Sequence, residues 1–458
     1  MDGAPMTLAE GKKLPEHLDT PPRAPGGRPL VGHMKALLAD PLGLLAALPH
    51  LGDVVELRFG RTPTYVVCSP EAAQHVLRNP DHAFDKGGTF YENMRSIIGD
   101  GMATCPLAQH KRLRRLAQPA FATSRMTGYA RTIQAQLDAF TSTWRPGQTL
   151  DVLPQLRSLA TRTTLATMFR RREFGPEIAG LRQAVTDFID HQTILRMIAP
   201  GLNRLPTARN RRYRKSEARL LRFLQEEIIA YRRDGIDHGD LMSMFTTHPE
   251  DDRLSDQEVR DTAMTVLLGG ITTTALSQAW ALHQLSQDPA LDAEVAGEAH
   301  AITLLDQGRS AAEVMDQLPL TRGVVAEVLR RRVASWIFTR VAVADTAIGS
   351  CRIPASAQVL LSPYVLHHRP DLFPSPDNFD PHRWDGRDPH RTKGWLPFGA
   401  GESKCIGYEL AFMDLTLSLA HITRSWRLQP CPAPVRPRPR MHLEPHGLTL
   451  RLADRSPH

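Results

Sequence analysis

Cysteine is scarce in this sequence. The 458 residues include five cysteines, scattered along the chain, and no C-x-x-C or C-x-x-C-H spacing occurs. Disulfide frameworks need paired cysteines, whereas structural zinc, iron–sulfur clusters and covalently attached c-type heme need those short spacings. The sequence therefore argues against all four kinds of site, and it favours a reducing cytoplasm as the compartment.

Long apolar runs are also missing. Residues 1–29 are rich in Pro and Gly without the apolar core of a signal peptide, and no stretch approaches the ~20 apolar residues that cross a membrane. The most apolar segment, 263–282, is interrupted by Thr, Gly, Ser and Gln. We expect neither a membrane anchor nor export. We also expect residues 1–29 to be an extended, poorly ordered segment ahead of the fold.

Basic residues outnumber acidic ones by 56 to 49, which gives a net charge of +7. This excess has three possible explanations: a solvated basic surface, a docking patch for an acidic protein, or nucleic-acid binding. No zinc-finger spacing, basic-region heptad or aromatic RNA-binding motif supports the third, so we expect no nucleic-acid partner. The basic run at 204–215 is typical of the solvated face of a helix.

The pattern of apolar residues predicts a mainly α protein with small β-sheets at its edges. Helical periodicity dominates from about residue 70 to residue 335. Residues 53–59 and 63–68 alternate around a Gly-Arg-Thr turn, which predicts a β-hairpin. A further helix is expected after Cys405, as far as Ser425, followed by loop and short strands. No clean linker divides the chain, so residues 30–458 are expected to form one domain.

The most specific motif surrounds Cys405. Phe398, Gly401, Cys405 and Gly407 follow the spacing Phe-x-x-Gly-x-x-x-Cys-x-Gly. The glycines let the backbone turn tightly against a flat ligand, and a helix beginning after the cysteine would direct N–H groups at the sulfur and stabilise a thiolate. Taken alone, a cysteine flanked by glycines indicates a buried structural thiol more often than a ligand. The full spacing is much more specific.

This spacing resembles the heme-binding loop of the cytochrome P450 family, and it continues through Leu410, Ala411 and Asp414 as that family's next helix does. The resemblance covers nearly the whole chain and is closest to actinobacterial members associated with terpenoid and other natural-product pathways. It implies the cytochrome P450 fold. It also implies heme b, iron protoporphyrin IX, with Cys405 as the axial thiolate.

Two further motifs occur in the order that the family requires. Glu327 and Arg330 share one helical face, which alone would indicate a surface ion pair, and residues 379–384 resemble the family's meander. The resemblance implies that Glu327, Arg330 and Arg383 form a buried, hydrogen-bonded triad behind the heme. Because removing one member of such a triad leaves the others unpaired, we assign it a structural role.

Gly269 and Gly270 occupy the middle of a predicted helix, where each costs about 1 kcal/mol relative to alanine. Either a ligand lies against the backbone there or the helix bulges. By resemblance this is the distal helix, where small residues leave room for dioxygen. Thr273 would then supply a hydroxyl that donates to dioxygen and holds a water. A threonine cluster that packs helices together is the alternative.

Basic residues expected to bind the heme propionates lie elsewhere in the chain. His110 and Arg114 share a helical face at i and i+4, and Arg340 occupies the place of another such arginine in the family. Alone, each would more often be a solvated base. The predicted cofactor-binding residues are His110, Arg114, Arg340, Phe398, Cys405 and Gly407.

Three positions depart from the family pattern. Ser403 replaces the usual Arg or His two residues before the cysteine, which removes one propionate contact. Thr272 replaces the usual acid, and we hypothesise that its hydroxyl joins water in relaying protons. The Pro-Pro expected after Arg330 is absent. Residues 336–338 therefore either give the substrate pocket a different shape or belong to the core.

An apolar pocket is expected above the heme. Its candidate residues are Phe90, Met94, Ile97, Leu268, Trp336, Ile337 and Phe338, although apolar stripes on a helix are also typical of plain core.

The resemblance implies a heme-thiolate monooxygenase that oxidises a hydrophobic small molecule, such as a terpenoid or another natural-product intermediate. The chain has no flavin- or nicotinamide-binding fingerprint, so a separate ferredoxin or flavodoxin with its reductase is expected to supply electrons, docking near Lys404. We expect a monomer. Two alternatives stay open. One is a heme-thiolate enzyme of altered chemistry (rearrangement, coupling or peroxide-driven), and the other is a non-catalytic heme- or ligand-binding paralogue.

Overall fold

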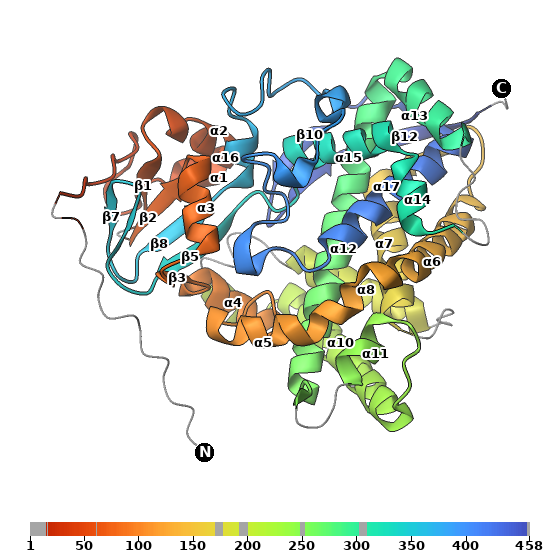
Figure 1. The fold of residues 1–458 in the computed structure, drawn as a ribbon, viewed down its shortest axis with the longest axis horizontal. Helices are drawn as coiled ribbons and strands as arrows, with labels where there is room; N and C mark the ends of the chain where they lie inside the picture. Colours follow the sequence, from red (N-terminus) through yellow and green to blue (C-terminus); the bar gives the residue numbers. More distant parts are fainter. Residues whose placement is uncertain are drawn as a thin grey trace.

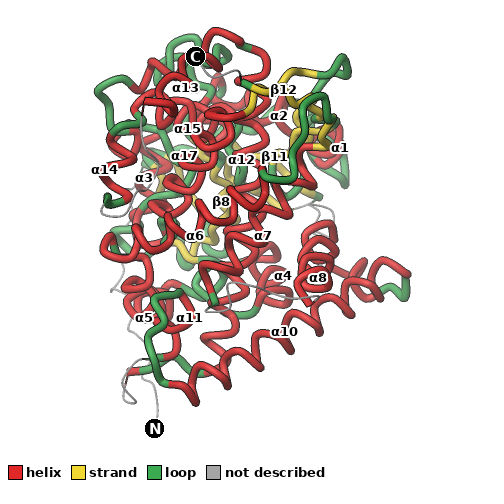
Figure 2. Tube along the Cα trace, turned by 90° about the vertical axis from the view of Figure 1, so that its right-hand side faces the viewer, coloured by secondary structure: helices red, strands yellow, loops and turns green. Residues whose placement is uncertain are grey.

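A computed structural model describes residues 15, 17–60, 62–169, 177–191, 200–247, 252–301 and 309–455. Helices make up most of this part of the chain, and strands form small patches (Figures 1 and 2). The α-helices are α1 (Met34–Ala39), α2 (Pro41–Ala46), α3 (Pro70–Arg78), α4 (Gly88–Ile98), α5 (Leu107–Ala117), α6 (Thr123–Thr141), α7 (Val152–Met168), α8 (Glu177–His191), α10 (Ala208–Asp234), α11 (Leu241–Thr246), α12 (Asp256–Gln287), α13 (Pro289–Ala301), α14 (Ala311–Asp316), α15 (Pro319–Arg331), α16 (Pro363–His367) and α17 (Tyr408–Ser425).

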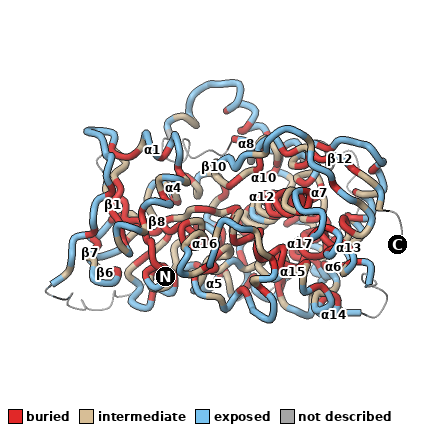
Figure 3. Tube along the Cα trace, turned by 90° about the horizontal axis from the view of Figure 1, so that it is seen from above, coloured by how far each residue is buried: buried red, intermediate tan, exposed pale blue. Residues whose placement is uncertain are grey.

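The longest helix, α12, passes through the middle of the helical region (Figure 1). Ser255 and Glu258 form a capping box that pairs N–H groups at its start. Side chains on nearly every side of α12 are buried because α7, α10, α15 and α17 pack around it. Seen from above, the buried residues follow these inner helices, and the exposed residues lie on the periphery (Figure 3).

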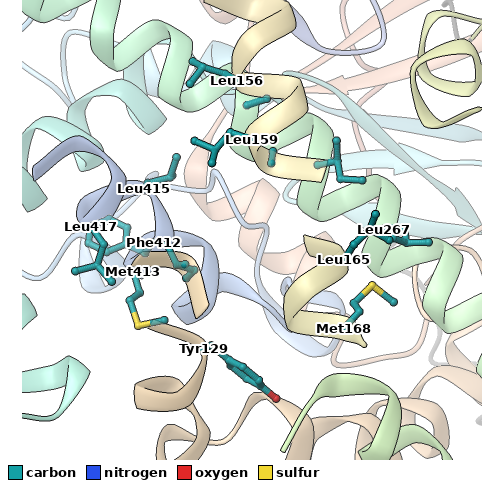
Figure 4. Close-up of a cluster of buried hydrophobic side chains, with 14 of the residues drawn as sticks. Tyr129, Leu156, Leu159, Leu165, Met168, Leu267, Phe412, Met413, Leu415 and Leu417 are labelled. Atoms are coloured by element: carbon teal, nitrogen blue, oxygen red, sulfur yellow. The ribbon is translucent and has the colours of Figure 1, made fainter. Parts of the chain in front are cut away.

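The main hydrophobic core joins helices that are distant in sequence. Leu267 on α12, Leu165 and Met168 on α7, and Leu415 on α17 all belong to one buried cluster (Figure 4). This cluster fixes α12 between α7 and α17. The position of any side chain on α12 is therefore set by packing on both sides.

The strands lie at the edges of the helical region. They are β1 (Val54–Phe59), β2 (Thr62–Val67), β3 (Phe84–Asp85), β4 (Thr149–Asp151), β5 (Phe338–Ala342), β6 (Thr346–Ile348), β7 (Cys351–Ile353), β8 (Gln358–Leu361), β9 (Trp426–Pro430), β10 (Arg436–Pro439), β11 (Leu443–His446) and β12 (Thr449–Asp454). The main sheet has the order β1-β2-β8-β5-β3, in which β2 and β8 run parallel.

The predicted hairpin is confirmed as β1 and β2, paired from Val54 with Val67 to Phe59 with Thr62. Both of its faces are covered. Val54 and Val67 pack into one apolar cluster, and Val55 and Val66 pack into another. Successive residues of each strand thus point into two different apolar cores. Neither face of the hairpin is a solvent face.

The predicted helical and basic segments are also present in the structure. Helices fill most of 70–335, and α17 ends at Ser425 as predicted. The basic run is confirmed as a solvated face, because Arg209, Arg211 and Arg212 at the start of α10 are exposed. Residues 1–14 and 16 lie outside the described residues. In the rest of 1–29, Asp19 and Arg23 form isolated bridges to Cys351 and Glu56.

We find no helix among the described residues with the length and apolarity needed to cross a membrane.

Candidate functional site

A cavity of about 520 Å³ lies between α12, the loop that carries Cys405, and residues of α4, α5 and β5. It brings together side chains that are far apart in the sequence, from Leu77 to Glu444. Predicted residues that line it are Phe90, Met94, Ile97, His110, Arg114, Leu268, Gly269, Gly270, Thr272, Thr273, Ile337, Phe338, Arg340, Phe398, Cys405 and Gly407.

The loop before α17 holds Cys405 at the edge of this cavity. The Cys405 N–H donates to the Phe398 carbonyl at 2.8 Å, which closes the loop on itself. Gly401 has a φ of +67°, and a Cβ there would overlap the Leu77 carbonyl, so only glycine fits. The exposed surface of Cys405 faces the cavity. The sequence motif thus encodes a close backbone approach between this loop and α3.

Opposing influences act on the pKa of Cys405. Burial raises the pKa of the thiol, while a backbone hydrogen bond from Gly407 and the charges of Arg114 and Lys404 lower it. The helix α17 begins at Tyr408, three residues after the cysteine. The N–H group that reaches the sulfur therefore comes from the turn at Gly407. Burial is the largest of these influences.

Basic side chains gather at another part of the cavity. Arg340 donates to the Tyr91 hydroxyl at 2.9 Å, and Arg114 donates to the Lys404 carbonyl. His110 is buried, and among the described residues its Nδ1 has no hydrogen-bond partner. Burial lowers the pKa of His110 to about 3, and nearby cations reinforce this effect. An unpaired nitrogen surrounded by cations indicates a place for an anion.

Lys86 belongs to this basic group, and the sequence analysis missed it. It is buried, lines the cavity and donates to the Met102 carbonyl at 2.5 Å. Burial lowers the pKa of Lys86 to about 8, and the charges of Arg340 and Arg95 contribute. A single lysine after a two-residue strand carries no recognisable signal, because only the folded chain places it beside His110.

The two glycines of α12 serve different contacts. The helix is α-helical throughout, so the alternative that it bulges is wrong for this structure. A Cβ on Gly269 would meet nothing within 4 Å, which means that this position opens onto the cavity. A Cβ on Gly270 would lie 3.3 Å from the Thr164 hydroxyl of α7. One glycine thus leaves space beside the helix, and the other allows close packing between helices.

The threonines that follow these glycines also line the cavity. The Thr273 hydroxyl donates to the Gly269 carbonyl at 2.6 Å, one turn earlier. Its oxygen can still accept a hydrogen bond from the cavity side. Thr272 is buried and lines the same cavity.

Glu327 and Arg330 are fully buried and joined by two hydrogen bonds of 2.7 and 2.9 Å. The third member differs from the prediction. Arg383 Nε lies 3.6 Å from Glu327, and within the described structure it has no hydrogen-bond partner. Trp384 donates its indole N–H to Glu327 at 3.1 Å instead. The turn at Pro381–Trp384 directs the indole, rather than the guanidinium, into hydrogen-bonding range.

The prediction that Trp336 lines the pocket is wrong. Its side chain is 0% exposed and packs beside Val55 and Val66, on the far side of the cavity wall. Its neighbours Ser335 and Ile337 line the cavity, whereas the Trp336 side chain turns away from it into the core. On α12, Leu268 reaches the cavity as predicted, whereas its neighbour Leu267 is a core residue.

A segment near the C-terminus contributes cavity residues that the sequence analysis did not identify. Arg440, Met441, His442 and Glu444 belong to or flank the turn between β10 and β11, and all of them line the cavity. Asp414 on α17 lines it as well. The tail was predicted only as loop and short strands, and nothing in its composition indicates that it folds back over this space.

Comparison with known proteins adds what the geometry alone does not decide. Residues 22–451 match the sequence model of the Cytochrome P450 family. This chain belongs to that family. It is 38% identical over 445 residues to cyclooctat-9-en-7-ol 5-monooxygenase of Streptomyces melanosporofaciens, with 93% of this chain and 94% of the relative covered. It is also 34% identical over 451 residues to pentalenene oxygenase of Streptomyces avermitilis, with 97% and 100% covered.

Membership of the cytochrome P450 family makes this chain a heme-dependent monooxygenase with a mainly α fold. The predicted likeness to actinobacterial P450s is confirmed, because both relatives come from Streptomyces. The family binds heme through a cysteine thiolate. The cavity fits such a group, since it combines a cysteine sulfur with basic side chains suited to two carboxylates. The unpaired Nδ1 of His110 is the specific observation behind this fit.

Proposed function

We propose that this P450 inserts oxygen into a hydrophobic small molecule of the terpenoid class. The supporting observation is that one cavity contains the Cys405 sulfur, the basic group around His110 and a largely apolar wall. Its volume of about 520 Å³ lies in the range of small-molecule sites. The two Streptomyces relatives are named for oxidising an unsaturated cyclic alcohol and pentalenene, which supports the same substrate class here.

The cofactor in this proposal is heme b. Cys405 would hold the iron, and Lys86, His110, Arg114 and Arg340 would hold the propionates. Bound there, the heme would supply the chemistry that activates dioxygen. Binding of the propionates would give the unpaired Nδ1 of His110 an anionic partner. It would also raise the pKa of His110 from its low value, because a neighbouring anion stabilises the imidazolium.

The remaining site residues position the substrate and move protons. Phe90, Met94, Ile97, Ile337 and Phe338 would exclude water and contact an apolar substrate. Gly269 leaves the space beside α12 that dioxygen needs. When its hydroxyl turns away from the Gly269 carbonyl, Thr273 would donate the proton on its Oγ1 toward that space. Thr272, in place of an acid, would pass protons through its hydroxyl and adjacent water.

Electrons would come from a separate ferredoxin or flavodoxin with its reductase, in the cytoplasm, to a monomeric P450. All five cysteines are free thiols, which suits a reducing compartment. Lys404 lies beside the cysteine, with its ammonium group 3.5 Å from the centre of the Tyr408 ring. Its charge would help to attract an acidic partner to this side of the protein.

The test is the difference spectrum of the reduced, carbon monoxide-bound protein. We expect a thiolate-type Soret band in the wild type and its loss in Cys405→Ala. Cys351→Ala is the matched control, because this thiol lies in β7 outside the cavity. Persistence of the band in Cys405→Ala would contradict the proposed ligand. Spin-state shifts with a panel of terpenoids would then test the substrate class.

Thr272 favours one second candidate, a heme-thiolate enzyme of altered chemistry such as a peroxide-driven oxidation. The position before Thr273 carries a hydroxyl where the family usually has an acid. Turnover with peroxide alone, compared with turnover through a reductase chain, separates the two.

A further inference from the structure

The hairpin of β10 and β11 covers part of the cavity with little support from other strands. Within the described chain these two strands pair only with each other. The tip between them, residues 440–442, lines the cavity. Because an isolated two-stranded hairpin is at best marginally stable, other contacts must fix its position.

Two buried tryptophans provide these contacts. Trp336 is 0% exposed, and its indole N–H donates to the Arg440 carbonyl at 3.0 Å. Trp280 is 1% exposed, and its indole N–H donates to the Leu443 carbonyl at 3.0 Å. The two hydrogen bonds lie at the two ends of the tip. A buried indole N–H needs an acceptor, so each bond fixes the hairpin relative to a core side chain.

The tryptophans are themselves held in place. The Ser362 hydroxyl donates to the Trp336 carbonyl at 2.8 Å. The Arg332 guanidinium lies 4.9 Å from the centre of the Trp280 ring, on its face. Trp280 belongs to α12, the helix that also carries Gly269 and Thr273. The tip is thus positioned relative to the same helix that forms the opposite part of the site.

A second part of the cavity wall is joined to the hairpin. The Leu443 N–H donates to the Ala334 carbonyl at 3.1 Å, and Ala334, Ser335 and Ile337, which flank Trp336 in the chain, line the cavity. Residues 333–338 and 440–444 therefore form one continuous wall. A shift of the Trp336 ring would move both of its parts.

We infer that Trp336 and Trp280 are positioning residues that set the width of the cavity, and thereby determine which hydrophobic ligands fit beside the heme. Neither side chain lines the cavity. Both would act through the backbone of the tip and the wall segment. The inference rests on the proposed function only in requiring that heme and substrate share this cavity.

The experiment compares two azoles that bind heme iron through a ring nitrogen. Imidazole is small, whereas 4-phenylimidazole must also fit its phenyl ring into the cavity. Trp336→Phe and Trp280→Phe keep an aromatic ring but remove the N–H donor. In each holoenzyme we expect the ratio of the two dissociation constants, measured by spectral shift, to change at least fivefold, with the thiolate band retained. Trp144→Phe is the matched control, because this buried indole lies away from the cavity.

A third variant, His442→Ala, changes the tip itself without disturbing the core, and we expect it to move the same ratio. It tests whether the tip limits ligand size, which the inference requires, even if the tryptophan variants lose heme. An unchanged ratio in His442→Ala, an unchanged ratio in tryptophan variants that keep heme, or an equal change in Trp144→Phe would overturn the inference. Absence of azole binding or of the thiolate band in the wild type would instead contradict the proposed function.

Discussion

His367 accepts a hydrogen bond from the Leu396 backbone N–H, with 2.8 Å between Nε2 and the amide nitrogen. Its Nδ1 lies 2.8 Å from the Arg330 carbonyl. Because the Leu396 amide can only donate, Nε2 carries no proton and Nδ1 does. Burial holds the pKa of His367 well below its usual value. The neutral imidazole thus joins the helix of the Glu327–Arg330 pair to the start of the cysteine loop.

His367→Leu should weaken this connection and the thiolate site with it. The substitution leaves the Leu396 N–H and the Arg330 carbonyl unpaired, which should lower the free energy of unfolding by roughly 2–4 kcal/mol. We also expect a smaller thiolate band and a larger inactive component in the carbon monoxide spectrum. His368→Leu is the control, because within the described chain the His368 side chain bonds to the Tyr364 carbonyl of the same turn and to no other element. Equal effects of the two variants would contradict the prediction.

The same histidine predicts a pH dependence of stability. In the unfolded chain its pKa is about 6.5, and in the folded protein it is well below that value. The unfolded state therefore binds more protons below pH 6.5, and stability falls as the pH decreases from there. Above that pH the histidine has no effect. Thermal unfolding at several pH values should show a smaller acid loss in His367→Leu than in the wild type.

Asp414 should show the opposite dependence. Burial raises the pKa of this carboxyl to about 6, and a hydrogen bond from Ser418 at 3.0 Å opposes the shift. As the pH rises, the folded protein keeps this proton longer than the unfolded chain does. The free energy of unfolding therefore decreases as the pH rises from about 4 to about 6, and it is constant above pH 6. Asp414→Asn should therefore gain on the order of 1 kcal/mol at pH 7.5, allowing for contact with the cavity, and nothing near pH 4. A gain that is equal at both pH values would refute this assignment.

Thr272 and Thr273 can be separated by the coupling of electron use to product. Thr273→Ala should lower the fraction of reducing equivalents recovered as product by about tenfold, because the hydroxyl that donates a proton is lost. Thr272→Ala should lower coupling less, through loss of the relay. Thr265→Ala is the control, since Thr265 also lines the cavity from α12 and also donates to the carbonyl one turn earlier, but lies about two turns before Thr273. If Thr272→Ala leaves coupling and rate unchanged, the relay hypothesis fails.

Lys86 should contribute to heme retention. Lys86→Met keeps the length of the side chain but removes a buried cation from the group around His110 and Arg340. We expect heme to transfer to apomyoglobin about tenfold faster, because charged hydrogen bonds contribute about 1.5–3 kcal/mol. Lys111→Met, at an exposed position beside His110, should leave the rate unchanged. An unchanged rate in Lys86→Met would contradict its place in the propionate site.

Sequence-based prediction works best for residues whose identity is fixed by the local backbone conformation. Gly401 must be glycine because its φ is positive and the Leu77 carbonyl is close. The motif around Cys405 can therefore be recognised from the sequence alone. Lys86 and Trp336 have no such local signal. Which face of the segment around Trp336 meets the cavity depends on the β10–β11 hairpin, about a hundred residues later. Likewise, only the tight turn at Pro381–Trp384 decides that Trp384 reaches Glu327 within hydrogen-bonding distance.

The hydrogen bonds that fix the hairpin tip end on main-chain carbonyls, and every amino acid has one. The side chains of Met441 and His442 can therefore vary without loss of the anchors at Arg440 and Leu443. Evolution can alter this part of the cavity surface while the residues that anchor it stay the same. An engineer could do likewise, by randomising residues 441 and 442 in a library and leaving both tryptophans unchanged.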